Sequence, residues 1–125
     1  MSLDVTLVGP RETVDETCPH CGQVYRKNYR EEYYDNNITH NLGLMAEEAG
    51  IYEALWRPEE IGITKAGQLI DPLTKGVALL VSDRDRFEVF NAPNGWGKYD
   101  HLVEFAQSYL RACIKYPEAE IEVSR

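Results

Sequence analysis

The residues with the clearest chemical potential form the string Cys18-Pro19-His20-Cys21-Gly22. Two thiolates separated by two residues can bind one metal ion from a tight turn, and the glycine permits the positive φ that such turns often need. The spacing therefore predicts that Cys18 and Cys21 hold a zinc ion. A tetrahedral site needs more ligands than these two, and His40, only nineteen residues beyond Cys21, is the preferred third metal ligand.

The other candidates for the zinc site are weaker or come from another chain. Cys113 falls on an apolar helical stripe, where a free cysteine behaves as a small hydrophobic residue. The candidates that remain are His20, His101 and carboxylates such as Asp35, or a second copy of the chain that contributes its own cysteine pair. The alternatives to a metal site are a redox-active dithiol and a reduced turn that binds nothing.

The cysteine string resembles a zinc-ribbon knuckle, whose usual form is Cys-Pro-x-Cys-Gly. The resemblance covers five residues, and a ribbon needs a second such pair, which this sequence lacks. Cys-Pro-His-Cys is also the dithiol string of periplasmic oxidants of the thioredoxin superfamily, where a helix N-terminus lowers the pKa of the first thiol. No βαβ pattern surrounds the string here, so the sequence favours metal binding over redox chemistry.

A second candidate site lies in the polar and aromatic segment 33–41, which contains Asp35, His40 and Asn41. A carboxylate can orient an imidazole, which then acts as a base, a metal ligand or a hydrogen-bond donor. The competing interpretation is structural, because Asn and Thr side chains of this segment could cap a helix. Capping does not explain the histidine beside Asn41, so we expect Asp35, His40 and Asn41 to bind a ligand.

Two tryptophans define the other candidate binding residues. Trp96 lies in the string Asn94-Gly95-Trp96-Gly97, where Asn-Gly signals a turn and the glycines let the backbone pass close to a neighbour. Trp96 is either an anchor packed into the core or an exposed recognition residue. The same choice applies to Trp56, and the adjacent Arg57 either pairs with a nearby glutamate or faces an acidic ligand.

Charge is distributed unevenly and bears on the class of partner. Residues 1–30 carry four basic and four acidic side chains, whereas residues 31–125 carry nine and seventeen, so the formal charge of -8 belongs to the second part. Nucleic-acid binding draws most of its affinity from Lys and Arg contacts. Arg26, Lys27 and Arg30 form only a short basic cluster, so nucleic acid ranks last among the expected partners.

No apolar run approaches the ~20 residues of a membrane span. The N-terminus also lacks the basic start and the long apolar stretch of a signal peptide. We therefore expect a cytoplasmic protein without membrane contact. A chain of 125 residues suits one domain over residues 1–125.

The elements that must position these residues follow from the periodicity of apolar side chains. Period-two alternation over residues 3–7 and 121–123 predicts strands at both ends, which can share one sheet, and residues 23–25 could add a third strand. Helical spacing over 38–49, 51–56, 69–81 and 99–113 predicts helices between them, with Pro72 interrupting the third.

The expected fold class is α+β, mostly helical, with a small antiparallel sheet formed by the N- and C-terminal strands. Within the single domain, residues 1–30 would hold a strand and the Cys-x-x-Cys turn. Residues 31–125 would form the helical body and the C-terminal strand.

From Tyr34 to Arg125 the chain resembles a group of small bacterial and phage-encoded proteins. The shared strings are Asn-Ile-Thr-His-Asn (37–41), Ala-Gly-Ile-Tyr (49–52), Leu-Trp-Arg-Pro-Glu-Glu (55–60), Asn-Gly-Trp-Gly-x-Tyr (94–99) and Val-Ser-Arg (123–125). One departure is Asp83-Arg84-Asp85-Arg86, where that group commonly has an Asp-Pro helix start. The resemblance implies a phage, prophage or mobile-element setting, and it transfers no catalytic residue.

Two functions remain open at this level. The first is an acidic, zinc-stabilised interaction module that presents exposed aromatic and arginine side chains to a protein or small-molecule partner, with homo-oligomers as an option. The second is a small metal- or histidine-dependent enzyme whose pocket forms from segments 35–41 and 94–99, because a catalytic constellation must meet in space. The predicted ligand-binding residues are Asp35, His40, Asn41, Trp56, Arg57, Asn94 and Trp96, and the predicted metal ligands are Cys18, Cys21 and His40.

Overall fold

A computed structural model describes residues 2–10 and 12–125 and confirms the α+β class, with 47% of the residues helical and 26% in strands. The strands are β1 (Ser2–Val8), β2 (Glu12–Thr17), β3 (Val24–Tyr29), β4 (Glu32–Thr39) and β5 (Glu120–Ser124). The α-helices are α1 (Gly43–Glu48), α2 (Tyr52–Trp56), α3 (Ile70–Ser82), α4 (Arg84–Glu88) and α5 (Tyr99–Lys115). Short 3-10 helices are η1 (His40–Leu42), η2 (Pro58–Ile61) and η3 (Ala66–Leu69).

The main sheet has the strand order β4-β1-β5, with β1 antiparallel to both neighbours. Val5 lies opposite Val123, which confirms the expected pairing of the N- and C-terminal strands. Alternation places Leu3, Val5 and Leu7 on the face toward the helices, where all three side chains are fully buried. The sheet therefore supplies one wall of the hydrophobic core.

The third strand of this sheet differs from the expected one. Residues 32–39 form β4, so the prediction of a helix that already includes Ile38 was wrong. Ile38 lies opposite Leu3 in the sheet and is buried there, while its strand neighbours are polar. The period-two pattern is hidden because Asn36 takes an inward position that an apolar residue would usually occupy.

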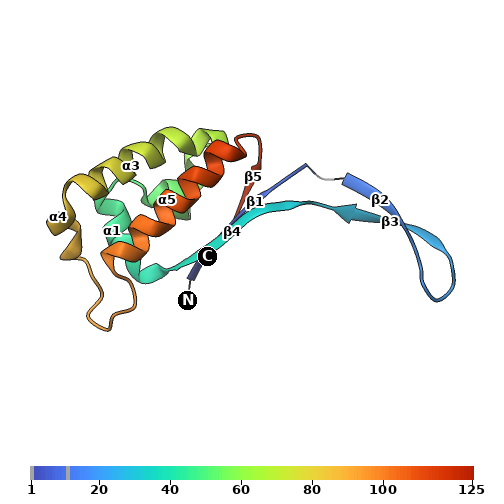
Figure 1. The fold of residues 1–125 in the computed structure, drawn as a ribbon, viewed down its shortest axis with the longest axis horizontal. Coiled ribbons are helices and arrows are strands. Elements are labelled where there is room, and N and C mark those ends of the chain that lie inside the picture. The colour runs from blue at the N-terminus through green and yellow to red at the C-terminus, as the bar shows by residue number, and fades with distance from the viewer. Residues whose placement is uncertain (1, 11) are drawn as a thin grey trace.

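Strands β2 and β3 form a separate two-stranded sheet, which we call the arm (residues 12–29). The expectation that residues 23–25 join the terminal sheet was wrong, because β3 pairs with β2 instead. Figure 1 shows the arm extending away from the helices as a long curved hairpin. No residue of the buried core, as far as the chain is described, comes from this arm.

The arm is attached to the main sheet by Arg30. Its guanidinium donates to Glu120 at 2.5 Å, to Glu122 at 2.9 Å and to the carbonyl oxygen of Gly9 at 3.2 Å. The Arg30 side chain is only 17% exposed, whereas the two carboxylates are more than half exposed. One residue at the base of the arm thus ties the hairpin to β5.

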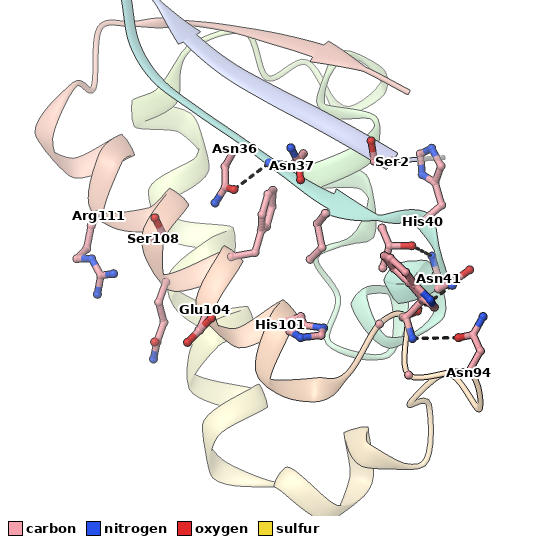
Figure 2. Close-up of a pocket in the computed structure, with 17 residues that line it drawn as sticks. Ser2, Asn36, Asn37, His40, Asn41, Asn94, His101, Glu104, Ser108 and Arg111 are labelled. Carbon is pink, nitrogen blue, oxygen red and sulfur yellow. Dashed lines mark hydrogen bonds between the residues drawn. The ribbon is translucent and has the colours of Figure 1, made fainter.

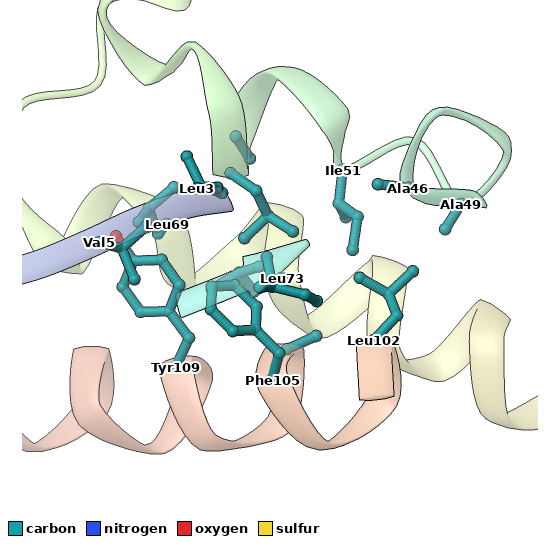
Figure 3. Close-up of a cluster of buried hydrophobic side chains, with 14 of the residues drawn as sticks. Leu3, Val5, Ala46, Ala49, Ile51, Leu69, Leu73, Leu102, Phe105 and Tyr109 are labelled. Atoms are coloured by element: carbon teal, nitrogen blue, oxygen red, sulfur yellow. The ribbon is translucent and has the colours of Figure 1, made fainter. Parts of the chain in front are cut away.

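Helices α3 and α5 pack against each other and complete the core (Figure 3). Leu73, Leu102 and Phe105 are buried between the helices and the sheet. Gly76 allows α3 to approach Ile51 closely, since a Cβ at Gly76 would lie 2.1 Å from Ile51 Cγ2. None of the helices in the described ranges has both the length and the apolar character that crossing a bilayer requires.

Candidate functional site

An open groove of about 1110 Å³ lies beside β4. One wall is the end of β4 with the turn that follows, the opposite wall is one side of α5, and the loop between α4 and α5 closes one end (Figure 2). Its lining comprises Ser2, residues 36–41, residues 94–97, His101, Glu104, Phe105, Gln107, Ser108 and Arg111.

Backbone polar groups of an edge strand contribute to the first wall. Because β4 is at the edge of the sheet order β4-β1-β5, its outer side pairs with no strand in the described part of the chain. Strand residues 36–39 and the first two residues of η1, His40 and Asn41, line the groove, so the end of β4 borders it along four consecutive residues. The N–H of Asn37 donates to the side-chain oxygen of Asn36 at 2.9 Å, a local bond within this wall.

Local hydrogen bonds join this wall to the loop. Thr39 ends β4 and its hydroxyl oxygen accepts from the N–H of Asn41 at 3.3 Å, which starts η1. The Asn41 side chain then donates to the carbonyl oxygen of Trp96 at 2.8 Å. Gly97, at φ +116°, leaves room for this approach, because a Cβ there would lie 3.1 Å from the Cβ of Asn41. The two segments that sequence analysis singled out are therefore bound to each other.

Trp96 is the exposed aromatic side chain of the groove. Its backbone N–H donates to the side-chain oxygen of Asn94 at 3.0 Å, and the positive φ of Gly95 completes the turn. The side chain is 71% exposed, so Trp96 is a surface residue and not a core anchor. An exposed tryptophan at the end of a groove is typical of a residue that a partner covers.

The second wall is a polar stripe on α5. His101, Glu104, Ser108 and Arg111 recur at helical spacing, so their side chains share one side of the helix (Figure 2). Ser108 accepts a hydrogen bond at 3.1 Å from the hydroxyl of Tyr34, which couples this wall to β4. One carboxylate and one guanidinium balance each other here, so the groove is polar but carries little net charge.

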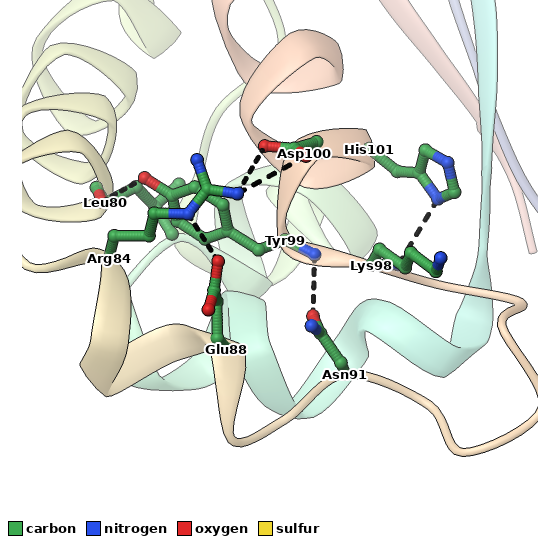
Figure 4. A network of polar contacts seen from close by, with 8 residues as sticks. All are labelled: Leu80, Arg84, Glu88, Asn91, Lys98, Tyr99, Asp100 and His101. Atoms are coloured by element: carbon green, nitrogen blue, oxygen red, sulfur yellow. Dashed lines mark hydrogen bonds and ion pairs between the residues drawn. The ribbon is translucent and has the colours of Figure 1, made fainter.

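The start of α5 is fixed by a network that positions His101 (Figure 4). Asn91 accepts from the N–H of Tyr99 at 2.7 Å, and the Tyr99 hydroxyl donates to the carbonyl oxygen of Leu80 at 2.6 Å. His101 Nδ1 accepts from the N–H of Lys98 at 3.2 Å. Burial is the main cause that raises the pKa of Tyr99, so this hydroxyl keeps its proton and remains a donor.

His40 lies where two grooves meet. Its Nδ1 accepts from the indole N–H of Trp56 at 2.8 Å, so in this arrangement Nε2 carries the ring proton. Trp56 is 3% exposed and stacks on Tyr52 with ring centroids 5.3 Å apart. Trp56 is therefore a core residue that orients His40 through this hydrogen bond, and its ring is too buried to serve as a broad contact surface for a ligand.

The predicted ligand-binding residues are partly brought together. His40, Asn41, Asn94 and Trp96 line the large groove. Trp56 and Arg57, again with His40, line a smaller groove of about 470 Å³, where Arg57 pairs with Glu60 at 3.2 Å. Asp35 lines neither of these two grooves; it lies opposite Thr6 in the sheet.

The α5 stripe and the edge of β4 were missed by sequence analysis. The stripe had a readable signal, because His101, Glu104, Ser108 and Arg111 form the polar complement of the apolar face of the predicted helix 99–113. The edge position of β4 had none, since strand order depends on which segments pair across the whole chain.

The two cysteines of the predicted zinc site lie in the turn at the end of the arm. The backbone N–H groups of Cys21 and His20 are the main causes that lower the pKa of the Cys18 thiol, and the Cys21 side chain acts in the same direction. His40 follows β4 at the end nearer the helices, and the described residues contain no group of three or more His, Cys, Asp or Glu that could hold a metal ion. The structure therefore does not bring His40 to the two cysteines.

The third cysteine is buried in the core, and the basic side chains of the arm lie beside acidic ones. Cys113 is fully buried, and burial raises the pKa of its thiol to about 12. Arg26 lies 3.7 Å from Asp15 and Lys27 lies 3.6 Å from Glu16 across the arm, while Arg30 is the tie to β5 described above. Each of these basic side chains thus has an acidic neighbour.

Comparisons with protein-family models, with curated proteins and with solved structures found no match for this chain.

Proposed function

We propose that the protein is an interaction module that binds an extended segment of a partner protein in the groove between β4 and α5. The observation that carries this proposal is the edge of β4 along one wall, where strand residues 36–39 line the groove. An edge strand offers unpaired N–H and C=O groups, and an extended peptide can add to it as a further strand.

The backbone of β4 would supply the affinity of such a complex. The N–H of Asn37 donates to the neighbouring Asn36 side chain at 2.9 Å, and we infer that a carbonyl oxygen of a partner strand can replace this acceptor. Hydrogen bonds to an added strand recur along the backbone and do not depend on the partner's side chains. We infer that residues 36–39 pair with a partner segment of roughly four to six residues.

The opposite wall and Trp96 would supply specificity. The α5 stripe offers an imidazole, a carboxylate, a hydroxyl and a guanidinium, so it fits a polar segment of low net charge. A strongly acidic segment would be repelled by the formal charge of -8. Trp96, largely exposed, would pack on one apolar side chain of the partner and act as the energetic centre of the contact.

The enzyme hypothesis rests on His40, whose Nε2 is not used by the bond to Trp56. In this arrangement Nε2 carries the ring proton, and the unprotonated nitrogen, Nδ1, already accepts from Trp56. A nucleophilic mechanism needs a hydroxyl or thiol that is activated by an unprotonated base. Among the residues that the structure describes, no hydroxyl or thiol is hydrogen-bonded to an imidazole, and the predicted partner Asp35 lies outside the groove. The groove therefore favours binding over catalysis. For the location, we propose the cytoplasm, where the thiols of the protein would stay reduced.

The test uses a displayed library of random peptides of about eight residues, which span roughly 26 Å when extended. Peptides selected on the full chain are synthesised and their affinity is measured by fluorescence anisotropy. We expect Trp96→Ala to weaken binding about tenfold or more, since it removes the exposed anchor. Val81→Ala is the matched control, because Val81 is 57% exposed and lines none of the grooves described above, so affinity should not change.

A second measurement distinguishes strand addition from side-chain contact alone. N-methylation of every second peptide amide should abolish binding in one register and leave it intact in the other, because only alternate amides face the edge strand. A selected peptide that binds Trp96→Ala as tightly as the native chain would contradict the proposal. So would equal tolerance of N-methylation at all positions, or a library from which no peptide is enriched.

A further inference from the structure

The turn at the end of the arm is a tight loop that carries Cys18 and Cys21. Cys18 donates its backbone N–H to the carbonyl oxygen of Gln23 at 2.8 Å and accepts from the N–H of Gly22 at 2.9 Å. Gly22 has φ +72°, a conformation that other residues adopt at a cost. Both thiols are free, and Cys21 is exposed to solvent. The loop thus carries two free thiols, of which Cys21 is exposed and Cys18 half-buried.

This loop holds only half of a zinc site. Structural zinc is almost always four-coordinate, so two thiolates leave two positions to fill. In the described part of the chain, no third His, Cys, Asp or Glu completes a metal-binding group with the pair. His20, which lies between the two cysteines in sequence, does not do so either. The arm also places the pair at the end of the molecule opposite the helices (Figure 1), so the body cannot supply the missing ligands.

We propose that two copies of the chain meet at the ends of their arms and that one zinc ion is held there by Cys18 and Cys21 of each copy. Four thiolates then complete a tetrahedral site. Each thiol gives up its proton to solvent as it binds the metal, so the complex forms with proton release and weakens as pH falls.

Charge and exposure both support a second copy as the partner. Residues 1–30 sum to zero charge, whereas residues 31–125 carry the whole -8, so contact through the arms keeps the acidic bodies apart. Val14, Tyr25 and Tyr29 are exposed apolar side chains on the arm. An isolated two-stranded ribbon is marginally stable in water, and a second arm packed against these side chains would stabilise it.

The test uses the full chain, reduced and freed of metal, to which zinc is added while the molar mass is followed by sedimentation. We expect the 14.3 kDa chain to double in mass at one zinc ion per two chains. Cobalt in place of zinc should give the intense absorption of a tetrahedral site with thiolate ligands. Removal of the metal with a chelator should return the monomer.

Variants identify the ligands. Cys18→Ser and Cys21→Ser should each weaken zinc binding about tenfold or more and remove the dimer, whereas Cys113→Ala should retain both. His20→Ala should also retain them if four thiolates fill the site. One zinc ion per monomer, zinc binding that survives both serine variants, loss of the dimer in His20→Ala, or no uptake of zinc at micromolar concentration would each overturn the proposal. Peptide binding in the groove is measured separately, so its failure would leave this result intact.

Discussion

At the scale of single residues, Tyr109 carries a buried polar group without a hydrogen-bond partner among the described residues. Its side chain is fully buried between α5 and the sheet, where its ring stacks with Tyr34 at 5.8 Å and its hydroxyl finds no hydrogen bond among the described residues. Burial is the main cause that raises the pKa of this hydroxyl, so it stays protonated. Tyr34, by contrast, donates to Ser108 and accepts from Asn36, both at 3.1 Å.

This contrast gives opposite expectations for two similar variants. Tyr109→Phe should leave the free energy of unfolding unchanged or raise it by about 1 kcal/mol, because an unsatisfied buried hydroxyl costs energy in the folded state. Tyr34→Phe should lower it by about 1 kcal/mol through the loss of two hydrogen bonds. Urea denaturation measures both. A clear destabilisation by Tyr109→Phe would mean that its hydroxyl bonds to a buried water.

Residue types pointed to part of the site and not to its geometry. His40, Asn41, Asn94 and Trp96 were singled out from turn signals and polar-aromatic composition, and all four line one groove. The assignment of Asp35 as a companion of His40 used closeness in sequence. An extended strand rises about 3.3 Å per residue, so Asp35, within β4, lies well away from His40, which follows the end of that strand in η1.

At the scale of elements, the arm depends on one buried tie. Arg30 is mostly buried and makes three hydrogen bonds at the base of the arm, while Arg26 is 83% exposed and lies 3.7 Å from Asp15. A charge-assisted bond from a partly buried guanidinium is worth more than a surface ion pair, which solvent and salt screen.

We therefore expect unequal effects from two arginine variants of the arm. Arg30→Ala should lower the free energy of unfolding by about 1–2 kcal/mol, because the carboxylates it holds are half exposed and regain only part of their solvation. Arg26→Ala should change it by less than about 0.5 kcal/mol. Urea denaturation at low and high salt measures both, and equal effects would show that Arg30 is an ordinary surface residue.

Element prediction succeeded where one face is apolar and failed where it is mixed. The regular apolar stripe of 99–113 predicted α5 closely, and the terminal strands were read from their alternation. Strand β4 was missed because its inward positions hold Tyr34 and Asn36 as well as Ile38, so it does not look like a half-buried strand. Its pairing with β1 overrides that weak local signal.

At the scale of the whole molecule, the arm and the body do not share a hydrophobic core in the described part of the chain. The buried cluster draws on β1, the end of β4 and the helices, and in the described ranges it includes nothing from the arm. The two proposed contacts lie on different parts, with the peptide groove on the body and the zinc ligands at the end of the arm.

Replacement of residues 11–29 by a two-residue Asn-Gly turn tests this separation. The native sheet already brings Gly9 and Glu31 together through a backbone hydrogen bond of 2.8 Å, so a tight hairpin turn can join the strands there. We expect the free energy of unfolding to stay within about 1 kcal/mol of the full chain, because core burial is retained. Zinc uptake should be lost and peptide affinity retained. A shortened chain that does not fold would show that the arm stabilises the body.

The sequence by itself determined the class of the fold, the strand character of its two ends, the apolar face of α5, and the turn that carries two thiols. These features follow from local periodicity and turn chemistry, which act over a few residues. Tertiary structure alone decided that β4 is an edge strand, that its end faces α5 across a groove, and that His40 lies far from the cysteines. Those outcomes depend on which distant segments pair, because strand order is set by burial summed over the whole chain and not by any one segment.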